Sequence, residues 1–221
     1  MEQVGDFDMR KIITICREFG SGGREVGKRV AEILQVPYYD NEIVTELAKR
    51  TEFAEEYISR FSEKRIEPVV YPPITIGRSL HAARGYFQPV SQKMSQNMNI
   101  HIEQGKLLRE YATASDCVIV GRCANHILKD MDPLRVFVYA DMDSKIRRCL
   151  EKTPENEKLT EKELVRHIKE VDKSRAAYYK AITGEEWGKK IDYDIMINTT
   201  YYSIKLVSKI IAQKILFGDE E

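Results

Sequence analysis

The 221-residue sequence has no excess of charge of either sign and no long apolar run. Lysine and arginine together number 35, as do aspartate and glutamate. Without a net field to attract polyanions, we expect no nucleic-acid partner and no attraction to an anionic membrane. No apolar run approaches the roughly 18 residues that span a bilayer, and the acidic start MEQVGDFDMR lacks the apolar core of a signal peptide. We therefore predict a cytoplasmic protein without a membrane partner.

Cysteine is also sparse, and its positions are scattered. The four cysteines are Cys16, Cys117, Cys123 and Cys149, and no two have a close metal-ligand spacing such as C-x-x-C. Cys16 and Cys117 lie in apolar runs, so we interpret them as small core residues. The sequence therefore predicts no metal-ligating residues and a reduced environment, which agrees with a cytoplasmic setting.

The sequence does contain short apolar strands that alternate with amphipathic helices. Buried strands are predicted over residues 12–16, 117–120, 135–140 and 193–198, with a weaker fifth over 36–40. Because these runs are continuous rather than alternating, they indicate strands covered on both faces, as in a parallel sheet. The spacing of apolar residues predicts helices over 25–34, 41–50, 141–152, 159–182 and 203–216.

Individual residues mark the ends and the buried faces of these helices. Asp141 can cap the helix that follows it, and Thr160 with Glu163 forms a capping-box signature. The last helix is expected to turn four residues towards the core, namely Ile204, Val207, Ile210 and Ile211.

Alternating strands and helices predict an α/β fold with helices on both faces of a five-stranded parallel sheet. The length suits one domain over residues 1–221, with a core of about 10–65 and 101–221. Residues 66–100 are rich in proline and break the alternation, so we interpret them as an irregular insert. Either a monomer or a homodimer is compatible with this organisation.

A glycine-rich turn joins the first predicted strand to the first predicted helix. The segment FGSGGREVGK, residues 19–28, has three glycines in four positions, which permits positive φ angles and close approach of a ligand. Backbone N–H groups at a helix N-terminus favour an anion, and phosphate is the usual occupant. In the phosphate-loop pattern G-x-x-x-x-G-K-[ST], however, Gly23 stands where lysine is expected, with Arg24 next to it and Arg17 before the loop.

Two other interpretations of this turn compete with a phosphate loop. Gly20, Gly22 and Asp40 partly match a dinucleotide-binding pattern, in which the acid binds a ribose hydroxyl. The third glycine of that pattern would stand at position 25, where Glu25 fits a close helix–strand contact poorly. A plain structural turn rarely needs three glycines beside an arginine. The loop by itself leaves the three interpretations open.

Two later segments bear on this choice. DCVIVGRCANHIL, residues 116–128, places Gly121 and Arg122 directly after a buried strand. IKEVDKSRAAYY, residues 168–179, places Arg175 on a charged helix. With REFGSGGREVGKRVAE, residues 17–32, these segments resemble the cytidylate kinase-like family of P-loop nucleoside monophosphate kinases. The resemblance covers nearly the whole chain except residues 66–100.

The resemblance implies a fold, co-substrates and a division of the chain. It implies the three-layer α/β/α P-loop NTPase fold, with ATP and Mg²⁺ as co-substrates and a small-molecule nucleotide as the partner. It also implies that residues 66–100 form the acceptor-binding region and that residues of about 150–190 form an arginine-bearing lid.

The resemblance further implies roles for single residues. The donor phosphates would be held by Gly20, Ser21, Gly22, Gly23 and Arg24, with Arg148 or its neighbour Arg147 near the ATP. Arg122 would hold the phosphate of the acceptor, and Asp40 would open the acceptor segment. Arg175 would be the lid arginine, oriented by Asp172 three residues earlier. In the insert, Arg78 and Arg84 are candidates for a second acceptor arginine.

Four departures from the family pattern qualify the expected chemistry, one of which is that Arg175 is the only arginine between Val171 and Lys180, where the family lids hold several. The loop lysine is absent, Cys123 stands where cytidylate kinases have an aspartate, and Glu46 stands where they have an arginine. We expect γ-phosphoryl transfer from ATP to a small phosphate-bearing acceptor, such as a CMP-like monophosphate. The catalytic residues would be Arg122, Arg175 and Arg24, with Arg24 replacing the lysine. The alternative is a nucleotide-binding protein without catalysis that senses or scaffolds.

Overall fold

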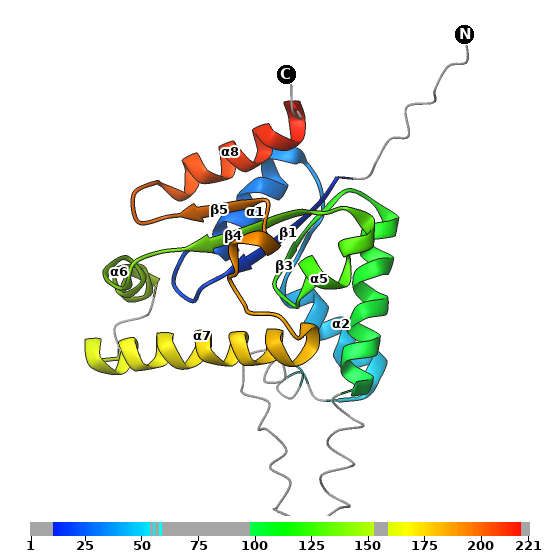
Figure 1. Cartoon of the computed structure of the whole chain (residues 1–221), viewed down its shortest axis with the longest axis horizontal. Coiled ribbons are helices and arrows are strands. Elements are labelled where there is room, and N and C mark those ends of the chain that lie inside the picture. Colours follow the sequence, from blue (N-terminus) through cyan, green and yellow to red (C-terminus); the bar gives the residue numbers. More distant parts are fainter. Residues whose placement is uncertain (1–10, 54, 56–57, 59–97, 153–158, 218–221) are drawn as a thin grey trace, which may run out of the picture.

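The computed structural model describes residues 11–53, 55, 58, 98–152 and 159–217. Its sheet has five strands, which are β1 (Ile12–Arg17), β2 (Tyr38–Tyr39), β3 (Cys117–Val120), β4 (Leu134–Tyr139) and β5 (Ile195–Asn198). The strands run parallel in the order β2-β3-β1-β4-β5, so β1 lies at the centre (Figure 1). The predicted five-stranded parallel sheet is therefore confirmed.

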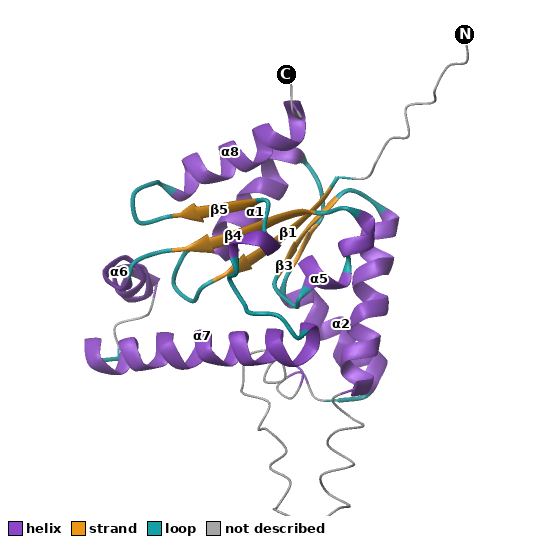
Figure 2. Cartoon of the chain, in the orientation of Figure 1, coloured by secondary structure: helices purple, strands orange, loops and turns teal. Residues whose placement is uncertain are grey.

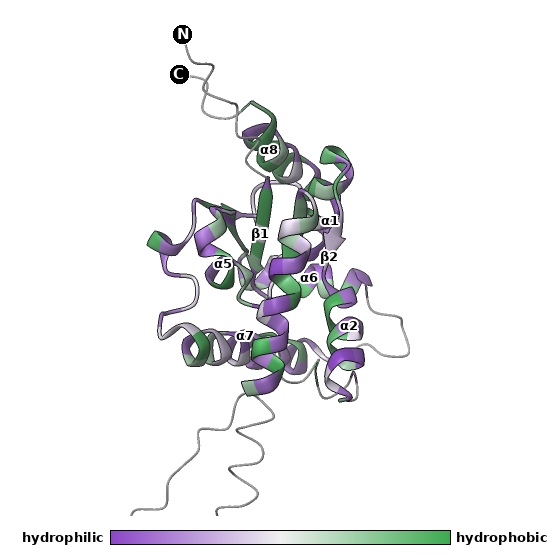
Figure 3. Ribbon diagram, turned by 90° about the vertical axis from the view of Figure 1, so that its right-hand side faces the viewer, coloured by the Kyte–Doolittle hydropathy of each residue, from purple (hydrophilic) through white to green (hydrophobic). Residues whose placement is uncertain are grey.

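The central strands are apolar along their length because neither of their faces meets water. In β1 the residues from Ile12 to Cys16 are all buried, and β3 is buried throughout. The register pairs Ile13 with Val118 on one side and with Leu134 on the other. Figure 3 shows β1 as hydrophobic along its length. This burial explains the unbroken β-branched runs in the sequence.

Helices cover both faces of the sheet, as Figure 2 shows. On one face, α1 (Gly23–Leu34) and α8 (Ile204–Phe217) pack against β1, β3, β4 and β5. On the other face lie α2 (Asn41–Thr51), α5 (Ala124–Ile127) and a helix whose described part covers 98–114. The two clusters bury mainly Ile, Val and Leu, which makes apolar burial the main stabilising term. The predicted three-layer α/β/α arrangement is confirmed.

Two further helices follow β4 in the chain and pack beside the glycine turn. They are α6 (Met142–Lys152) and α7 (Glu161–Thr183), which pack together through Ile146, Leu164 and Ile168. Both predicted caps are confirmed. The Asp141 carboxylate accepts the Ser144 N–H at 2.7 Å, and a capping box joins Thr160 with Glu163 at the start of α7.

Several expectations from the sequence need correction. Ile210 was expected to face the core but is 43% exposed, because the inward stripe of α8 runs through Val207 and Ile211. The last strand begins at Ile195 rather than at residue 193, because a short 3₁₀ turn, η3 (Lys190–Asp192), precedes it. The helix within 98–114 was not predicted.

Part of the predicted organisation lies outside the described residues. This applies to Arg78, Arg84 and nearly all of the predicted insert at residues 66–100. The division into core, insert and lid therefore stays a prediction. Among the residues described, no helix is both long and apolar enough to cross a membrane.

Candidate functional site

The glycine turn lies at the carboxyl end of β1, where ligands bind in open α/β sheets. Gly20 and Gly22 have φ angles of 74° and 85°, which L residues rarely adopt. Gly22 is the N-cap of α1 and offers no side chain to cap it. The Gly23 N–H donates to the Ser21 hydroxyl at 3.4 Å, and the partial positive charge at the N-terminus of α1 favours an anion there, as the phosphate-loop interpretation requires.

Side chains distant in sequence form hydrogen bonds to the backbone of this turn. The Ser21 carbonyl accepts the Thr199 hydroxyl at 2.7 Å and Nη1 of Arg148 at 3.5 Å. Arg148 also donates to the Thr199 carbonyl, and burial lowers the pKa of its guanidinium. The Ser21 hydroxyl donates to the Glu18 carbonyl at 2.8 Å. Arg148 thus lies at the loop and braces its backbone, whereas Arg147 is exposed. Contact of Arg148 with ATP stays a prediction.

A groove of about 650 Å³ opens above the turn, and we call it the donor groove. It brings together several predicted residues, namely Gly20, Gly22, Gly23, Arg24 and Arg148. The opposite wall comes from α6 and α7 and includes Cys149, Lys152 and His167. At the rim, the hydrogen bond from Lys152 lowers the pKa of Glu25.

Asp40 is buried at the start of α2 and binds two arginines. Its carboxylate lies 2.5 Å from Nε of Arg24 and 3.5 Å from Nη2 of Arg17. The Arg24 side chain is 58% exposed and also donates to the Asn41 side chain at 3.3 Å. Asp40 was predicted to bind substrate, and here its carboxylate already serves as the counterion of two guanidinium groups.

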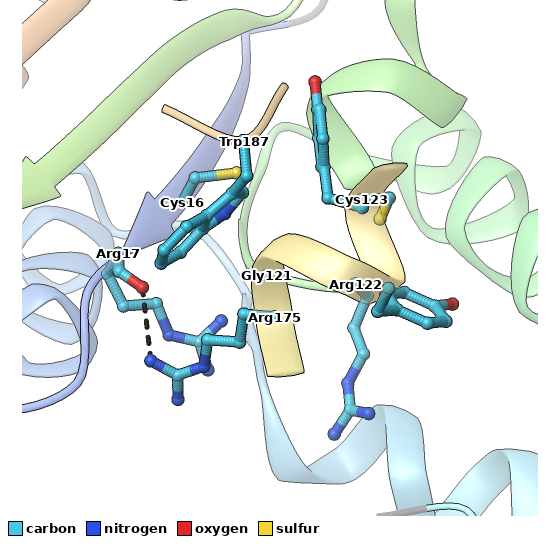
Figure 4. Close-up of a pocket in the computed structure, with 9 residues that line it drawn as sticks. Cys16, Arg17, Gly121, Arg122, Cys123, Arg175 and Trp187 are labelled. Atoms are coloured by element: carbon cyan, nitrogen blue, oxygen red, sulfur yellow. Dashed lines mark hydrogen bonds between the residues drawn. The ribbon is translucent and has the colours of Figure 1, made fainter. Parts of the chain in front are cut away.

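A second, smaller cavity lies between the ends of β1 and β3, and we call it the acceptor pocket. Its cationic lining residues are Arg17, Arg122 and Arg175. Figure 4 shows their guanidinium groups directed to the same side of the pocket. The cavity measures about 40 Å³, which admits a group of a few atoms, such as the anionic end of a small molecule.

Unusual backbone geometry presents Arg122 to this pocket. Gly121, Arg122 and Cys123 have φ angles of 77°, 59° and 53°, so three consecutive residues are left-handed. Such a conformation in non-glycine residues costs about 1–3 kcal/mol each and is concentrated at functional sites. The side-chain amide of Gln104 stabilises the turn by donating to the Arg122 carbonyl at 3.0 Å. This geometry agrees with the prediction that Arg122 emerges at the carboxyl edge of the sheet.

Arg175 reaches the same pocket from α7. It donates from Nη1 to the Arg17 carbonyl at 3.2 Å and lies 3.7 Å from the Asp172 carboxylate. The predicted contact with Asp172 is therefore present. Its guanidinium carbon also lies 5.8 Å from the centre of the Phe19 ring. Arg175 lines both cavities, so one arginine of α7 borders the donor groove and the acceptor pocket together.

Sequence reasoning missed Lys145, which joins the turn to α7. The Nζ of this buried lysine lies 2.7 Å from Glu18 and 3.3 Å from Asp172. Asp172 in turn accepts the Phe19 N–H at 2.7 Å, and burial raises the pKa of its carboxyl group. Nothing in the local pattern distinguishes Lys145 from other charged residues of α6. Arg17 was noted in the sequence as the cation before the loop but was given no place among the predicted site residues.

ATP and Mg²⁺, the co-substrates that the resemblance implies, do not fit the site equally well. The glycine turn and the N-terminus of α1 suit the phosphates of ATP. A resident Mg²⁺ fits less well, because Arg24 occupies the hydroxyl position of the phosphate-loop pattern. No group of three His, Cys, Asp or Glu side chains within the described ranges is arranged to hold a metal. Mg²⁺ generally binds through substrate phosphates and water, so it would arrive with the nucleotide.

Comparison with known proteins agrees with this architecture. The solved structure of an uncharacterized protein from Eubacterium ventriosum ATCC 27560 is 27% identical, with a TM-score of 0.65, over 96% of this chain and 100% of that chain. Shikimate kinase from Acinetobacter baumannii in complex with shikimate is 14% identical, with a TM-score of 0.51, over 97% and 98%. TT1252 from Thermus thermophilus is 16% identical, with a TM-score of 0.53, over 97% and 100%. The two lower identities show a shared fold alone.

A search of curated proteins gave no match. The sequence profile of the cytidylate kinase-like family, however, matches residues 12–201, which include the glycine turn, Arg122 and Arg175. This match agrees with the parallel sheet, the phosphate-binding turn and the arginine pocket, and it supports a phosphotransferase. By this match, the chain belongs to the cytidylate kinase-like family.

Proposed function

We propose that the protein transfers the γ-phosphoryl group of ATP to a small phosphate-bearing acceptor, such as a CMP-like nucleoside monophosphate. The observation that carries this proposal is the adjacency of the two cavities. The donor groove lies over the glycine turn, the acceptor pocket lies over Arg122, and Arg17 and Arg175 line both. A donor and an acceptor bound in these cavities would meet at the two shared arginines.

The chemistry requires little of the protein beyond positioning and charge neutralisation. An oxygen of the acceptor phosphate attacks the γ-phosphorus, and the bond from that phosphorus to the oxygen bridging it to the β-phosphate breaks. The products are ADP and an acceptor that carries one more phosphoryl group. A phosphate monoester oxygen is already ionised near neutral pH, so no strong general base is needed. Arg122 would bind the acceptor phosphate, and Arg175 would contact the transferred group.

The identity of the acceptor base is the finer part of this proposal. Two positions associated with cytidylate recognition differ here. Cys123 is buried in the acceptor pocket, and Glu46 on α2 pairs with Arg50 at 3.0 Å. Cysteine offers a weak hydrogen-bond donor, and a carboxylate paired on the helix surface offers no cation to a phosphate. A pyrimidine acceptor therefore needs a direct test.

The proposal is tested by a phosphate-transfer assay with ATP and Mg²⁺. The acceptor panel contains CMP, dCMP, UMP, AMP and GMP, with shikimate as an acceptor that carries a carboxylate in place of a phosphate. We expect production of ADP that depends on one of the monophosphates, together with a diphosphate product resolved by chromatography. Formation of ADP at the same rate with and without every acceptor would contradict the proposal.

The alternative is a nucleotide-binding protein that no longer transfers phosphate. The absence of lysine at position 23 favours it, because that lysine ordinarily neutralises charge during transfer. Thermal shifts with ATP, NAD and the monophosphates, each with and without Mg²⁺, distinguish the two functions. Stabilisation by a ligand follows its concentration relative to Kd. Stabilisation by ATP without a transfer product would favour the alternative, and stabilisation by NAD alone would favour a dinucleotide site.

A further inference from the structure

We propose that Arg17 supplies the positive charge that lysine supplies in the usual phosphate loop. This inference rests on the proposed function and deepens it. When the pattern G-x-x-x-x-G-K is laid over residues 17–23, it requires glycine at position 17 and lysine at position 23. This chain has Arg17 and Gly23. The cation and the glycine have therefore exchanged places between the first and the last position of the loop.

The structure explains why the two positions must change together. A Cβ atom added at Gly23 would overlap the Cβ of Arg17, and it would lie 3.1 Å from the Arg17 Cγ and 3.2 Å from the Cβ of Val138. The start of α1 and the end of β1 thus share one small space. That space holds the stem of one side chain, and here it holds the stem of Arg17. Tight packing leaves no room for a second stem.

The guanidinium end of Arg17 is fixed as closely as its stem. A Cβ atom at Gly121 would overlap Nη1 of Arg17, so glycine at the end of β3 leaves room for the charge. The Asp40 carboxylate lies 3.5 Å from Nη2, and the two side chains are 13% and 5% exposed. Two glycines and one buried acid therefore hold this arginine in one position, which is the preorganisation that charge neutralisation requires.

Arg17 is also better placed than Arg24 to act on the transferred group. Arg17 lines both the donor groove and the acceptor pocket, and Figure 4 shows its side chain next to that of Arg175. Arg24 lines the donor groove and bonds to Asn41 on α2. A cation between the two cavities can neutralise the γ-phosphate during transfer, as the loop lysine does in related chemistry.

The test is a cycle of variants in the full-length protein. It compares Arg17→Gly, Gly23→Lys and the double variant Arg17→Gly/Gly23→Lys, which restores the first glycine and the lysine of the usual pattern. Arg17→Met removes the charge and keeps much of the stem. Arg29→Met is the matched control, because Arg29 lies on α1 and pairs with Glu25. Each protein is measured for phosphate transfer, for the Kd of tripolyphosphate and for Tm.

We expect Arg17→Met to lower kcat by about 10²–10³-fold, the usual loss when one preorganised donor is removed. Tripolyphosphate binding should weaken by about tenfold or more. Arg29→Met should change neither value. Gly23→Lys alone should lower Tm, whereas the double variant should recover that Tm and transfer phosphate at least about tenfold faster than Arg17→Gly. Such coupling marks two residues that share one space.

The outcomes separate this inference from the proposed function. If the wild-type protein transfers phosphate and Arg17→Met does so equally well, Arg17 is not the loop cation and the proposed function stands. If the wild-type protein transfers none but its tripolyphosphate binding depends on Arg17, the proposed function fails and the assignment of Arg17 holds. If the Tm losses of the two single substitutions simply add in the double variant, the proposed exchange of the cation and the glycine is wrong. This test holds even if Arg17→Met fails to fold. Failure of the wild-type protein to bind tripolyphosphate would overturn both proposals.

Discussion

The donor groove and the acceptor pocket lie on either side of Arg17 and Arg175, but they present different groups to a ligand. The donor side offers the backbone of a glycine turn, which Thr199 and Arg148 hold from below. The acceptor side offers guanidinium groups from three separate elements. Backbone donors are set by the fold and change little with sequence, whereas side-chain donors can be replaced one at a time. We therefore expect changes on the donor side to cost stability and ATP binding, and changes on the acceptor side to alter acceptor use.

The largest effect is expected from Gly22→Ala on the donor side. The new Cβ would overlap the Cδ1 of Ile204, and the φ angle of 85° is itself unfavourable for alanine. We expect a loss of about 3 kcal/mol in the free energy of unfolding and a loss of ATP binding. Denaturant unfolding and ATP titration measure the two effects.

Gly184→Ala is the matched control for this change. Gly184 has a φ angle of 75° and no atoms within 4 Å of the added Cβ, so only backbone strain is introduced. That strain should cost about 1 kcal/mol and leave ATP binding intact. Equal losses of stability in the two variants would show that packing on Ile204 does not hold the turn.

The second-largest effect is expected from Arg122→Met, which tests the acceptor side. Removal of this guanidinium should lower kcat/KM for the acceptor by about 10²-fold and leave the Kd of ATP within about twofold. Arg109→Met is the control, because Arg109 pairs with Asp130 on the surface at 2.8 Å. An equal weakening of ATP binding by Arg122→Met would remove the distinction between the two sides.

A smaller effect is expected from Thr199→Val beneath the turn. Valine has nearly the same shape but loses the hydroxyl that donates to the Ser21 carbonyl. We expect a loss of about 1–2 kcal/mol in stability, with ATP affinity lower by several-fold. In the control Thr51→Val, a hydrogen bond of 2.6 Å within α2 is removed instead. Weaker ATP binding in both variants would mean that ATP affinity reports general stability, with no special role for the brace.

The smallest perturbation is alkylation of the cysteines: Cys149 lines the donor groove, whereas Cys16 and Cys123 line the acceptor pocket. Burial raises the pKa of Cys16, in the acceptor pocket, to about 11. At pH 8 on the order of one thiol in a thousand would then be ionised, and the reactive fraction should rise with pH towards 11. Cys149, in the donor groove, is only partly buried, although burial raises its pKa as well.

Iodoacetamide labelling followed by peptide mass spectrometry tests this difference. We expect Cys149 to react faster than Cys16 at pH 8, because reagent access is greater in the donor groove. ATP should slow the labelling of Cys149. Protection of Cys149 by the acceptor alone would contradict the assignment of the two cavities.

Much of the fold could be predicted because its signals are local. Continuous β-branched runs predicted the central strands, and Thr160 with Glu163 predicted the start of α7. The glycines of the turn predicted a phosphate-binding position at the end of the first strand. The helix within 98–114 was missed because its described part begins inside the segment of residues 66–100, which was interpreted as irregular. Ile210 was misassigned because an apolar residue on a surface helix need not face the core.

The sequence by itself determined the order of strands and helices, the glycine turn, and the missing lysine at position 23. Only the tertiary structure decided that the stem of Arg17 fills the space beside that position. It brings Gly121, which directly follows β3, against the guanidinium of Arg17, which lies at the end of β1, and it binds Asp40 to Arg17 and Arg24 together. Periodicity along a chain reports which face of an element is buried, whereas the sharing of one space by distant side chains depends on packing between elements.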